Sequence, residues 1–420
     1  MKKLLLILCM STVLSLAGCS SSMEALLNQS PAEPELTEEE KMAIRREEQL
    51  VPLLEEAQQL ALGYYYEEAL ECLSSVPLEF ADDTEVTDAI SNYIDASNNF
   101  VPYEEPVRHI FFHSLIVDTS LAFDGDHMSN GYNYWMTTVD EFKAMLEELY
   151  KNNFVLIDIH DLCREEMDED GNVTLVANAP LVPAGKKPLI LSVDDVNYYE
   201  YMEEDGFARK LLIDKNGDAK NLYIDQEGNE LIGDYDVVPI LDTFVKEHPD
   251  FSLRGAKGIL ALTGYEGTLG YRTNAPESAT YEQDKADAKA VADRLKETGW
   301  HFAVHGWGHR DAAKISYDHL KQDTMRWKDE VGSLVGDTDI YIYTYGSEVD
   351  YPSDKLSYLQ SEGYRYFCGV WTKPFVSVKD TYVRQSRCNL DGFNMITRPG
   401  SFADLFDTEK VLDTTRPELE

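Results

Sequence analysis

The sequence predicts an α/β protein with a parallel sheet that is closed or nearly closed. From residue 107 onward, apolar runs of strand length alternate with segments of helical period. The strand runs lie at residues 109–112, 154–157, 189–193, 258–262, 302–304, 340–343 and 365–368. This alternation is typical of parallel strands joined by helical crossovers.

Helical period is clearest in three segments between these runs. The apolar positions are Phe142, Met145, Leu146 and Leu149, then Ala288, Val291, Ala292 and Leu295, then Leu320, Thr324, Trp327, Val331 and Leu334. Spacings of three and four residues give each helix one apolar face. We expect those faces to cover the sheet.

The N-terminus has the pattern of an export signal. Lys2 and Lys3 precede an apolar run too short to span a membrane as a mature helix, which predicts a signal peptide over residues 1–18. Residues 16–19, Leu-Ala-Gly-Cys, resemble a bacterial lipobox, in which Cys19 becomes the lipidated N-terminus. Ordinary signal cleavage is the alternative. We expect an extracytoplasmic lipoprotein anchored to the bacterial cell membrane through Cys19.

A spacer and a helical segment follow. Residues 19–37 contain two prolines and no apolar period, which predicts a flexible tether. Residues 38–100 start with a capping-box pattern and resemble a tetratricopeptide-like hairpin, broken at Gly63 and extended by a third helix from about residue 83. One hairpin cannot bury a continuous core alone. We expect it to pack on the α/β region or on a protein partner, with the tyrosines at 64–66 packing rather than binding a ligand.

Charge and cysteine content exclude other classes. The chain has 77 acidic and 37 basic residues and a formal net charge of −40, so nucleic acid is not an expected partner. The cysteines that remain after processing lack a Cys-x-x-Cys spacing, and we expect buried thiols, with a Cys368–Cys388 disulfide as the alternative. They are Cys72, Cys163, Cys368 and Cys388.

Two short stretches carry residues suited to metal chemistry. One apolar run ends in Asp194-Asp195, and another is followed by His305 and His309. The C-terminal ends of barrel strands meet at one face. Two imidazoles and one carboxylate can hold a divalent metal with a position left for water, whose pKa falls towards about 7. The second carboxylate could act as its base. The alternatives are a chance histidine spacing and a solvated turn.

These stretches resemble the first two motifs of the polysaccharide deacetylases, the NodB-homology carbohydrate esterases. The resemblance covers residues 107–412 and implies a distorted (β/α)7 barrel, here preceded by a small helical segment. It implies Asp194 as catalytic base and Asp195, His305 and His309 as ligands of a divalent metal, commonly zinc. The implied activity is removal of acetyl groups, N-acetyl or O-acetyl, from a cell-wall or extracellular polysaccharide.

The third family motif, commonly Arg-x-Pro-Tyr-Gly, is only partly matched. Its counterpart here begins at Ile342 and includes Tyr345, whose main-chain N–H the resemblance assigns to the oxyanion. Ile342 stands where the family has an arginine that orients the base. The candidates to replace that arginine are Arg272, Arg310 and Arg398.

The last family motif supplies a general-acid histidine that this chain lacks. The final apolar run, at residues 393–400, is predicted as a strand and has no histidine, and none follows His319. His113, at the end of the first barrel strand, is the candidate acid, with bracing of that strand as the alternative. A slow enzyme, or a site that binds metal and sugar without turnover, would also fit.

Residues 196–257 interrupt the barrel pattern. Turn residues after apolar runs predict β-hairpins, and their place after the catalytic strand predicts a lid over the substrate cleft. Tyr198, Trp307 and Arg272 are the candidate substrate-binding residues, with Trp307 expected to pack beneath the ligand loop. Tyr198, Tyr199 and Tyr201 could stack on sugar faces, and core packing is the equal alternative. Besides the enzyme, two classes fit the sequence: a non-catalytic glycan-binding lipoprotein, and an assembly factor acting through residues 38–100.

Overall fold

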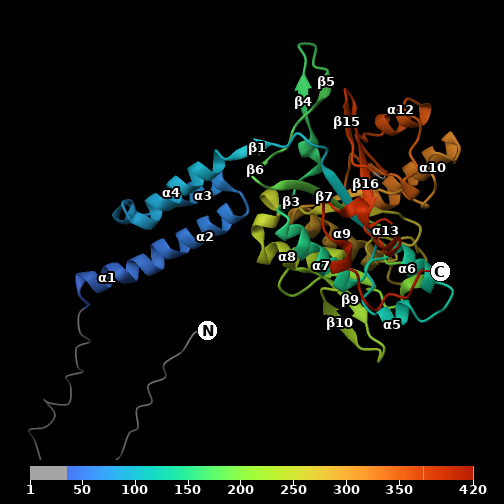
Figure 1. Ribbon diagram of the computed structural model, residues 1–420, viewed down its shortest axis with the longest axis horizontal. Coiled ribbons are helices and arrows are strands. Elements are labelled where there is room, and N and C mark those ends of the chain that lie inside the picture. Colours follow the sequence, from blue (N-terminus) through green and yellow to red (C-terminus); the bar gives the residue numbers. More distant parts are fainter. Residues whose placement is uncertain (1–35, 372, 420) are drawn as a thin grey trace, which may run out of the picture.

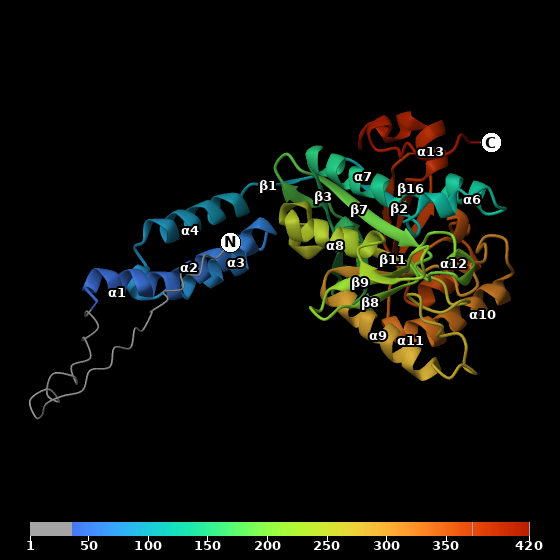
Figure 2. The same ribbon diagram turned by 90° about the horizontal axis from the view of Figure 1, so that it is seen from below.

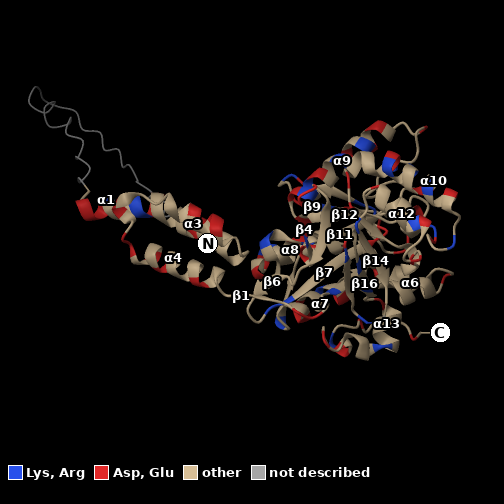
Figure 3. Ribbon diagram, turned by 90° about the horizontal axis from the view of Figure 1, so that it is seen from above, with Lys and Arg blue, Asp and Glu red and all other residues tan. Residues whose placement is uncertain are grey.

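A computed structural model describes residues 36–371 and 373–419. The predicted signal peptide, Cys19 and all but the last two residues of the predicted tether lie outside the described residues. None of the described helices is long and apolar enough to cross a membrane. Acidic residues occur on both the helical segment and the barrel (Figure 3).

Seven parallel strands close into a barrel, which confirms the predicted fold class (Figures 1 and 2). Around the ring they are β2 (Arg108–Phe112), β7 (Lys187–Asp194), β11 (Gly258–Leu262), β12 (Trp300–Val304), β13 (Ile340–Ile342), β14 (Tyr366–Val370) and β16 (Tyr382–Asn389), which returns to β2. All seven strand runs predicted from the sequence are present as strands. Six of them are ring strands, and the run at 154–157 is the side strand β3 (Phe154–Leu156). The remaining ring strand, β16, was not among the predicted runs.

The ring is uneven in two places. β3 pairs with the first residues of β7 and β11 with its last, so β7 has different neighbours along its length. β12 and β13 share one registered pair, Val304 with Tyr341. The antiparallel strand β15 (Val376–Lys379) extends β16 outside the ring, and the hairpin of β4 (Cys163–Met167) and β5 (Val173–Ala177) projects from the barrel (Figure 1).

Helices cover the outside of the ring with the apolar faces predicted from the sequence. The main ones are α7 (Val139–Lys151), α8 (Val237–Glu247), α9 (Tyr281–Glu297), α10 (Tyr317–Trp327) and α12 (Asp354–Ser361), with short α5 (Thr119–Ala122), α6 (Ser129–Trp135), α11 (Ser333–Val335) and α13 (Gly392–Thr397). α7 begins in a capping box between Thr138 and Glu141. Phe142, Met145 and Leu149 on its inner face are buried against the strands.

Strand residues alternate between the outer layer and the barrel interior. Ile190, Ala303, Ile342 and Cys368 point inward into one cluster, while their chain neighbours pack against the helices. Much of the barrel interior is therefore apolar. The inward positions nearest the C-terminal strand ends are polar, and they form the site described below.

The region 196–257 differs from the predicted insertion. It contains α8, which packs among the barrel helices, so only the part before α8 is added to the barrel pattern. The expected hairpins are present as an antiparallel sheet of β8 (Lys210–Ile213), β9 (Ala219–Ile224) and β10 (Glu230–Gly233). This sheet packs against α8 and α9, and only the residues that directly follow Asp195 reach the site. The lid stays a prediction.

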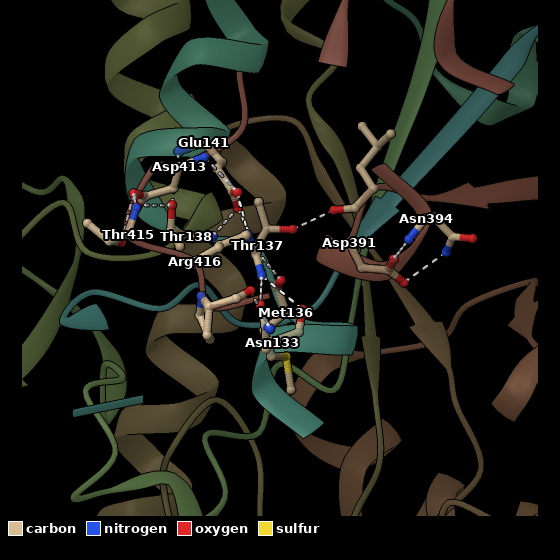
Figure 4. A network of polar contacts seen from close by, with 12 residues as sticks. Asn133, Met136, Thr137, Thr138, Glu141, Asp391, Asn394, Asp413, Thr415 and Arg416 are labelled. Carbon is tan, nitrogen blue, oxygen red and sulfur yellow. Dashed lines mark hydrogen bonds and ion pairs between the residues drawn. The ribbon is translucent and has the colours of Figure 1, made fainter. Parts of the chain in front are cut away.

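The C-terminal segment corrects another expectation. Residues 393–397 form most of α13, not a strand, because Asp391 caps a helix there. Beyond it, Arg416 is buried and pairs with Glu141 at the start of α7, and it also donates to the main-chain carbonyls of Asn133 and Met136 (Figure 4). This clasp ties the chain end to α6 and α7.

The N-terminal helices extend away from the barrel and touch it at one end (Figures 1 and 2). They are α1 (Glu38–Arg45), α2 (Val51–Leu62), α3 (Tyr66–Ser74) and α4 (Thr84–Ser97), followed by β1 (Phe100–Pro102), which pairs with β6 (Leu181–Pro183). Tyr64 is buried beside Phe100, and its hydroxyl donates to the carbonyl of Asp250 at 2.9 Å. The expected helices and the packing role of this tyrosine are confirmed; the tetratricopeptide likeness stays a prediction.

The four cysteines of the described chain are free thiols. Cys163 and Cys368 are buried, and burial raises the pKa of Cys368 to about 12. The expectation of buried thiols is thus met by Cys163 and Cys368 but not by Cys72 and Cys388, which are only partly buried; Cys368 and Cys388 are both free.

Candidate metal and catalytic site

The predicted site residues meet at the C-terminal ends of three ring strands. Asp194 is the last residue of β7, and Asp195 follows it. His305 follows β12, and His309 lies four residues further on. Tyr345 is in the short turn after β13. The barrel topology thus joins two stretches that are more than a hundred residues apart in the chain.

Asp195, His305 and His309 form a group whose potential ligand atoms all lie within 4.8 Å of one another. The His309 Nε2 is 3.5 Å from the Asp195 carboxylate. His305 is 2% exposed, whereas His309 and Asp195 are only partly buried. The group is thus anchored on one side and open to solvent on the other.

The other polar atoms of these three residues are already bound, which leaves one ligand atom of each free. His305 Nδ1 donates to the Ile342 carbonyl at 2.9 Å, so its Nε2 keeps a lone pair. His309 Nδ1 is 3.1 Å from the Tyr345 hydroxyl. The Tyr199 hydroxyl donates to one Asp195 oxygen at 2.6 Å. Fixed tautomers and braced carboxylates are what a metal site requires, and burial lowers the pKa of His305, which keeps it neutral. The residues therefore fit a divalent metal of zinc type.

Asp194 is paired with an arginine that the sequence analysis missed. Arg387, on β16, donates from both terminal nitrogens to the two carboxylate oxygens of Asp194, at 2.6 and 2.9 Å. Both side chains are buried. Burial would raise the pKa of Asp194, but the positive charge of Arg387 and its hydrogen bonds lower it to about 2. Asp194 is therefore ionised and fixed in orientation at neutral pH.

Arg387 therefore supplies the guanidinium that the resemblance places at position 342, where this chain has Ile342. Among the predicted substitutes, Arg272 and Arg398 bind elsewhere: Arg272 donates to main-chain carbonyls of Glu266 and Tyr198, and Arg398 to Asn394. Arg310 is also not the partner of Asp194, whose guanidinium partner is Arg387. The prediction of these three residues is wrong on this point.

A polar chain continues from Arg387 into the barrel. Arg387 also donates to the Ser192 hydroxyl at 3.2 Å, and Ser192 is 2.9 Å from the Nε2 of His109. The Nδ1 of His109 is 3.0 Å from Gln385. Burial, then the charge of Arg387, lowers the pKa of His109 to about 3, so this imidazole is neutral. Both terminal nitrogens of Arg387 and both ring nitrogens of His109 are engaged, which holds the support of Asp194 in place, while the buried Nε of Arg387 has no partner in the described chain.

The backbone at the site is in an unusual conformation. Positive φ occurs at Asp195 (59°), Tyr198 (53°), His309 (49°) and Tyr345 (58°), four of the eight non-glycine residues with positive φ in the described chain. Such conformations cost about 1–3 kcal/mol each and cluster at functional sites. The structure thus concentrates backbone strain on the predicted metal ligands and their neighbours.

The His305–His309 loop is supported from below. Asp323 of α10 accepts hydrogen bonds from the main-chain N–H groups of Trp307 and Gly308, at 2.7 and 2.9 Å. The Trp307 indole donates to Glu330 at 2.7 Å, and the guanidinium of Arg326 lies over its ring. Trp307 therefore packs beneath the ligand loop as expected, and its indole is engaged there rather than by a substrate.

The other predicted substrate residues are also structural. Tyr198 is 2% exposed, and its hydroxyl accepts from Asn221 at 3.0 Å. Arg272 holds the chain after Asp195 by donating to the Tyr198 carbonyl, and it pairs with Glu203. These contacts contradict direct substrate binding by Tyr198 and Arg272, because both groups are committed within the fold.

Three tyrosines near Asp195 form an aromatic stack. Tyr199 lies between Tyr201 and Tyr265, with ring centroids 5.5 and 5.1 Å away and nearly parallel planes. Tyr201 is 49% exposed, and Tyr345, across the site, is 70% exposed. Exposed aromatic faces beside a polar site suit ring-shaped ligands.

His113 lies on the same side of the barrel as Asp194. Its charge contributes to the lowered pKa of Asp194, and its ring packs edge-on against Phe111. The Nδ1 of His113 is buried, and within the described chain it has no hydrogen-bond partner.

Sequence reasoning missed Arg387 and His109, and it missed the contact of Tyr199 with Asp195. Both could have been found from parity, because residues two apart on a strand face the same way: Gln385 and Arg387 on β16 face inward as Ser192 and Asp194 do on β7, and His109 on β2 lies between Gln385 and Ser192. Tyr199 was expected only to stack on a sugar or to pack in the core, together with Tyr198 and Tyr201. Its contact with Asp195 depends on the positive φ of two residues, which no sequence pattern announces.

Comparison with known proteins gives two findings. Residues 273–367 match the family model of the polysaccharide deacetylases; this segment includes His305, His309 and Tyr345 but not Asp194. A solved structure, the deacetylase PplD of Streptococcus pyogenes in complex with acetate, is similar at 14% sequence identity and a TM-score of 0.40, over 76% of this chain and 100% of that chain. No curated protein matches the chain.

Proposed function

We propose that this protein is a metal-dependent hydrolase that removes acetyl groups, N-acetyl or O-acetyl, from a cell-wall or extracellular polysaccharide. The observation that carries the proposal is a set of three potential metal ligands beside the buried, ionised carboxylate of Asp194. Both lie at the C-terminal end of the barrel strands, and the segment 273–367 matches the deacetylase family model. Asp195, His305 and His309 would hold the metal, with zinc the first choice for a site of two imidazoles and one carboxylate.

A divalent metal at this position would polarise the acetyl carbonyl and make a water acidic enough to attack it near neutral pH. Asp194 would take the proton of that water. Its lowered pKa keeps it ready to accept, and the bidentate contact with Arg387 fixes the direction of its free lone pairs. Arg387 and His109 act by positioning, since they reach the substrate only through Asp194.

The developing oxyanion needs a donor and the leaving group needs a proton. The main-chain N–H of Tyr345 is proposed as the donor, and its positive φ supports a fixed peptide orientation. His113 is proposed as the acid because it directly follows β2 at the barrel end that holds Asp194 and its buried Nδ1 has no partner in the described chain. The proton would pass from His113 to the amine as the bond between carbonyl carbon and nitrogen breaks.

The stack of Tyr199, Tyr201 and Tyr265 supports a glycan as substrate. Apolar faces of sugar rings pack on exposed aromatic rings, and Tyr201 and Tyr345 offer such faces near the metal group. We further propose that the protein acts outside the cytoplasm, held to the membrane by lipid on Cys19. A Cys19→Ala variant that stays in the membrane fraction would contradict the anchor.

Acetate release from chitooligosaccharide and peptidoglycan fragments, with and without chelator, tests the activity. We expect release that chelation abolishes and zinc restores, and that Asp195→Ala removes. Asp225→Ala is the matched control, because this aspartate caps an exposed hairpin turn. Full release by the Asp195→Ala variant would refute the mechanism.

The second candidate is a glycan-binding lipoprotein without turnover. The absence of any histidine after His319 favours it. The absence of the motif arginine at Ile342 does not favour this candidate, because Arg387 supplies a guanidinium to Asp194. Equal glycan affinity of the wild type and Asp194→Asn, with no acetate released from a broad acetylated panel, would establish this candidate over the enzyme.

A further inference from the structure

A second group of histidines and carboxylates lies at the opposite end of the barrel. His301 is the second residue of β12, four residues before His305 and on the same inward-facing parity. At about 3.3 Å per residue, roughly 13 Å of strand separates the two. Asp158 and His160 belong to the turn after β3, and Asp339 directly precedes β13.

The group is tightly connected. One oxygen of Asp158 lies 2.6 Å from His160 Nδ1, and the other lies 2.7 Å from His301 Nε2. The Nε2 of His160 is 3.1 Å from Asp339. Potential ligand atoms of Asp158, His160 and His301 all lie within 4.8 Å of one another. Apart from the site above, this is the one such group that the described residues contain.

The barrel is open next to this group. β12 and β13 pair only at Val304 and Tyr341, so their N-terminal halves diverge. A cavity of about 780 Å³ lies at the divergence, and His160, His301 and Asp339 are in its lining. The four side chains are about one-third exposed, so an ion could reach them from solvent.

We propose that Asp158, His160 and His301 bind a second divalent transition metal, of zinc type, independently of the catalytic site. Two imidazoles and one carboxylate are ligands that zinc favours, whereas calcium and magnesium select oxygen. His160 Nδ1 and His301 Nε2 face the two oxygens of the same carboxylate, and Asp339 accepts from the far ring nitrogen of His160. A carboxylate behind a ligating imidazole is the arrangement that fixes the tautomer of zinc ligands.

The ion would act as a structural clamp. Its ligands come from the turn after β3 and from β12, and Asp339 adds the start of β13. Of these segments, β12 and β13 pair at a single registered position. Binding to the folded chain alone raises its stability by mass action.

Protons compete with a metal ion for the ligand atoms of this group. Although burial opposes it, hydrogen bonds to Asp158 and Asp339 raise the pKa of His160 to about 10. The same contacts would therefore persist as a charged network without metal. The two explanations differ in one measurable respect, which is whether zinc binds and stabilises the protein.

The test uses the full chain with the first site removed by His305→Ala and His309→Ala. After loading with zinc and dialysis, we expect about one zinc per chain by elemental analysis, and none after the further change His301→Ala. His319→Ala, an exposed histidine on α10, is the matched control and should keep the zinc. Less than a tenth of an equivalent in the starting variant, with a wild-type circular dichroism spectrum, would overturn the proposal.

A second measurement covers failure of the His301→Ala variant to fold. In the variant lacking the first site, added zinc should raise the midpoint of thermal unfolding, and Asp158→Asn, which keeps the shape and removes the anionic ligand, should abolish that rise. A midpoint unaffected by zinc would show that protons alone occupy the group. Neither result depends on the deacetylase proposal, since acetate release is not measured.

Discussion

Replacing Arg387 by Met tests the support of Asp194 most directly. The change removes two hydrogen bonds of 2.6 and 2.9 Å and leaves a buried carboxylate without its cation. Breaking a buried pair in this way costs about 3–5 kcal/mol. Part of that cost is visible in the pKa: a fall from 3.8 to about 2 corresponds to about 2 kcal/mol of stability.

The sign of the pH dependence follows from the lowered pKa. The contribution of Asp194 to stability is fully present above pH 3.8 and is lost as the pH falls towards 2. Without Arg387, burial dominates and the pKa of Asp194 rises. The stability deficit of Arg387→Met should therefore be largest near pH 7, where Asp194 is ionised, and smaller in acid, where the carboxyl takes up a proton.

The assay is acetate release as a function of pH, together with urea unfolding at pH 7 and pH 4. For Arg387→Met we expect kcat/KM to fall about 10- to 100-fold and the acidic limb to move up by about one pH unit or more. Arg387→Lys should keep the acidic limb near its wild-type position yet lose activity, because an ammonium cannot form the bidentate fork.

Arg108→Met is the matched control. Arg108 is the first residue of β2, the strand next to β16, and so lies at the opposite end of the barrel from Asp194. Its guanidinium forms a comparable double contact with Asp404. Its loss should lower stability without moving the pH profile. An Arg387→Met enzyme with unchanged kcat/KM and an unchanged acidic limb would refute the positioning role.

Three further predictions follow from contacts in the site and in the fold. Tyr199→Phe removes the hydrogen bond to Asp195 and should weaken zinc affinity about 10- to 100-fold by competition with a chelator; unchanged affinity would contradict it. His113→Ala should lower turnover about 100-fold or more and leave metal content unaltered, whereas a lower thermal midpoint with an unaltered pH profile would assign it to bracing. Arg416→Ala leaves Glu141 buried and unpaired, and should cost about 3–5 kcal/mol in chemical unfolding with no change in metal content; a loss below 1 kcal/mol would contradict the clasp.

The fold could be predicted from the sequence because its strongest signals are local. Apolar runs mark ring strands, and periods of three and four mark the helices that cover them. β16 escaped because its inward positions are polar: Gln385 and Arg387 break the apolar run that strand prediction relies on. The run at residues 393–397 was apolar enough to suggest a strand, but Asp391 caps it as a helix.

The site residues likewise fall into those that the sequence could predict and those that it could not. Asp195, His305 and His309 could be predicted to converge, because each follows a strand of a parallel barrel. Core packing of Tyr198 could not be told from sugar stacking in the sequence, because a tyrosine next to a strand end can turn into the core as easily as out of it. Tyr198 has a positive φ and is buried, while the adjacent Tyr199 reaches Asp195.

A buried carboxylate at a strand end requires a cation, and a closed barrel does not fix which strand supplies it. The motif that this chain resembles places an arginine at the end of β13, where Ile342 stands, on one side of β7; here Arg387 comes from β16, which reaches β7 through β2 on the other side. The requirement is electrostatic, so any inward position at the same height can meet it. Along β16 the inward residues are Val383, Gln385 and Arg387, and the outward Arg384 pairs with Glu348 instead. Parity therefore selects Arg387 over its neighbour, and a search for inward-facing arginines near strand ends would find such a replacement where motif matching does not.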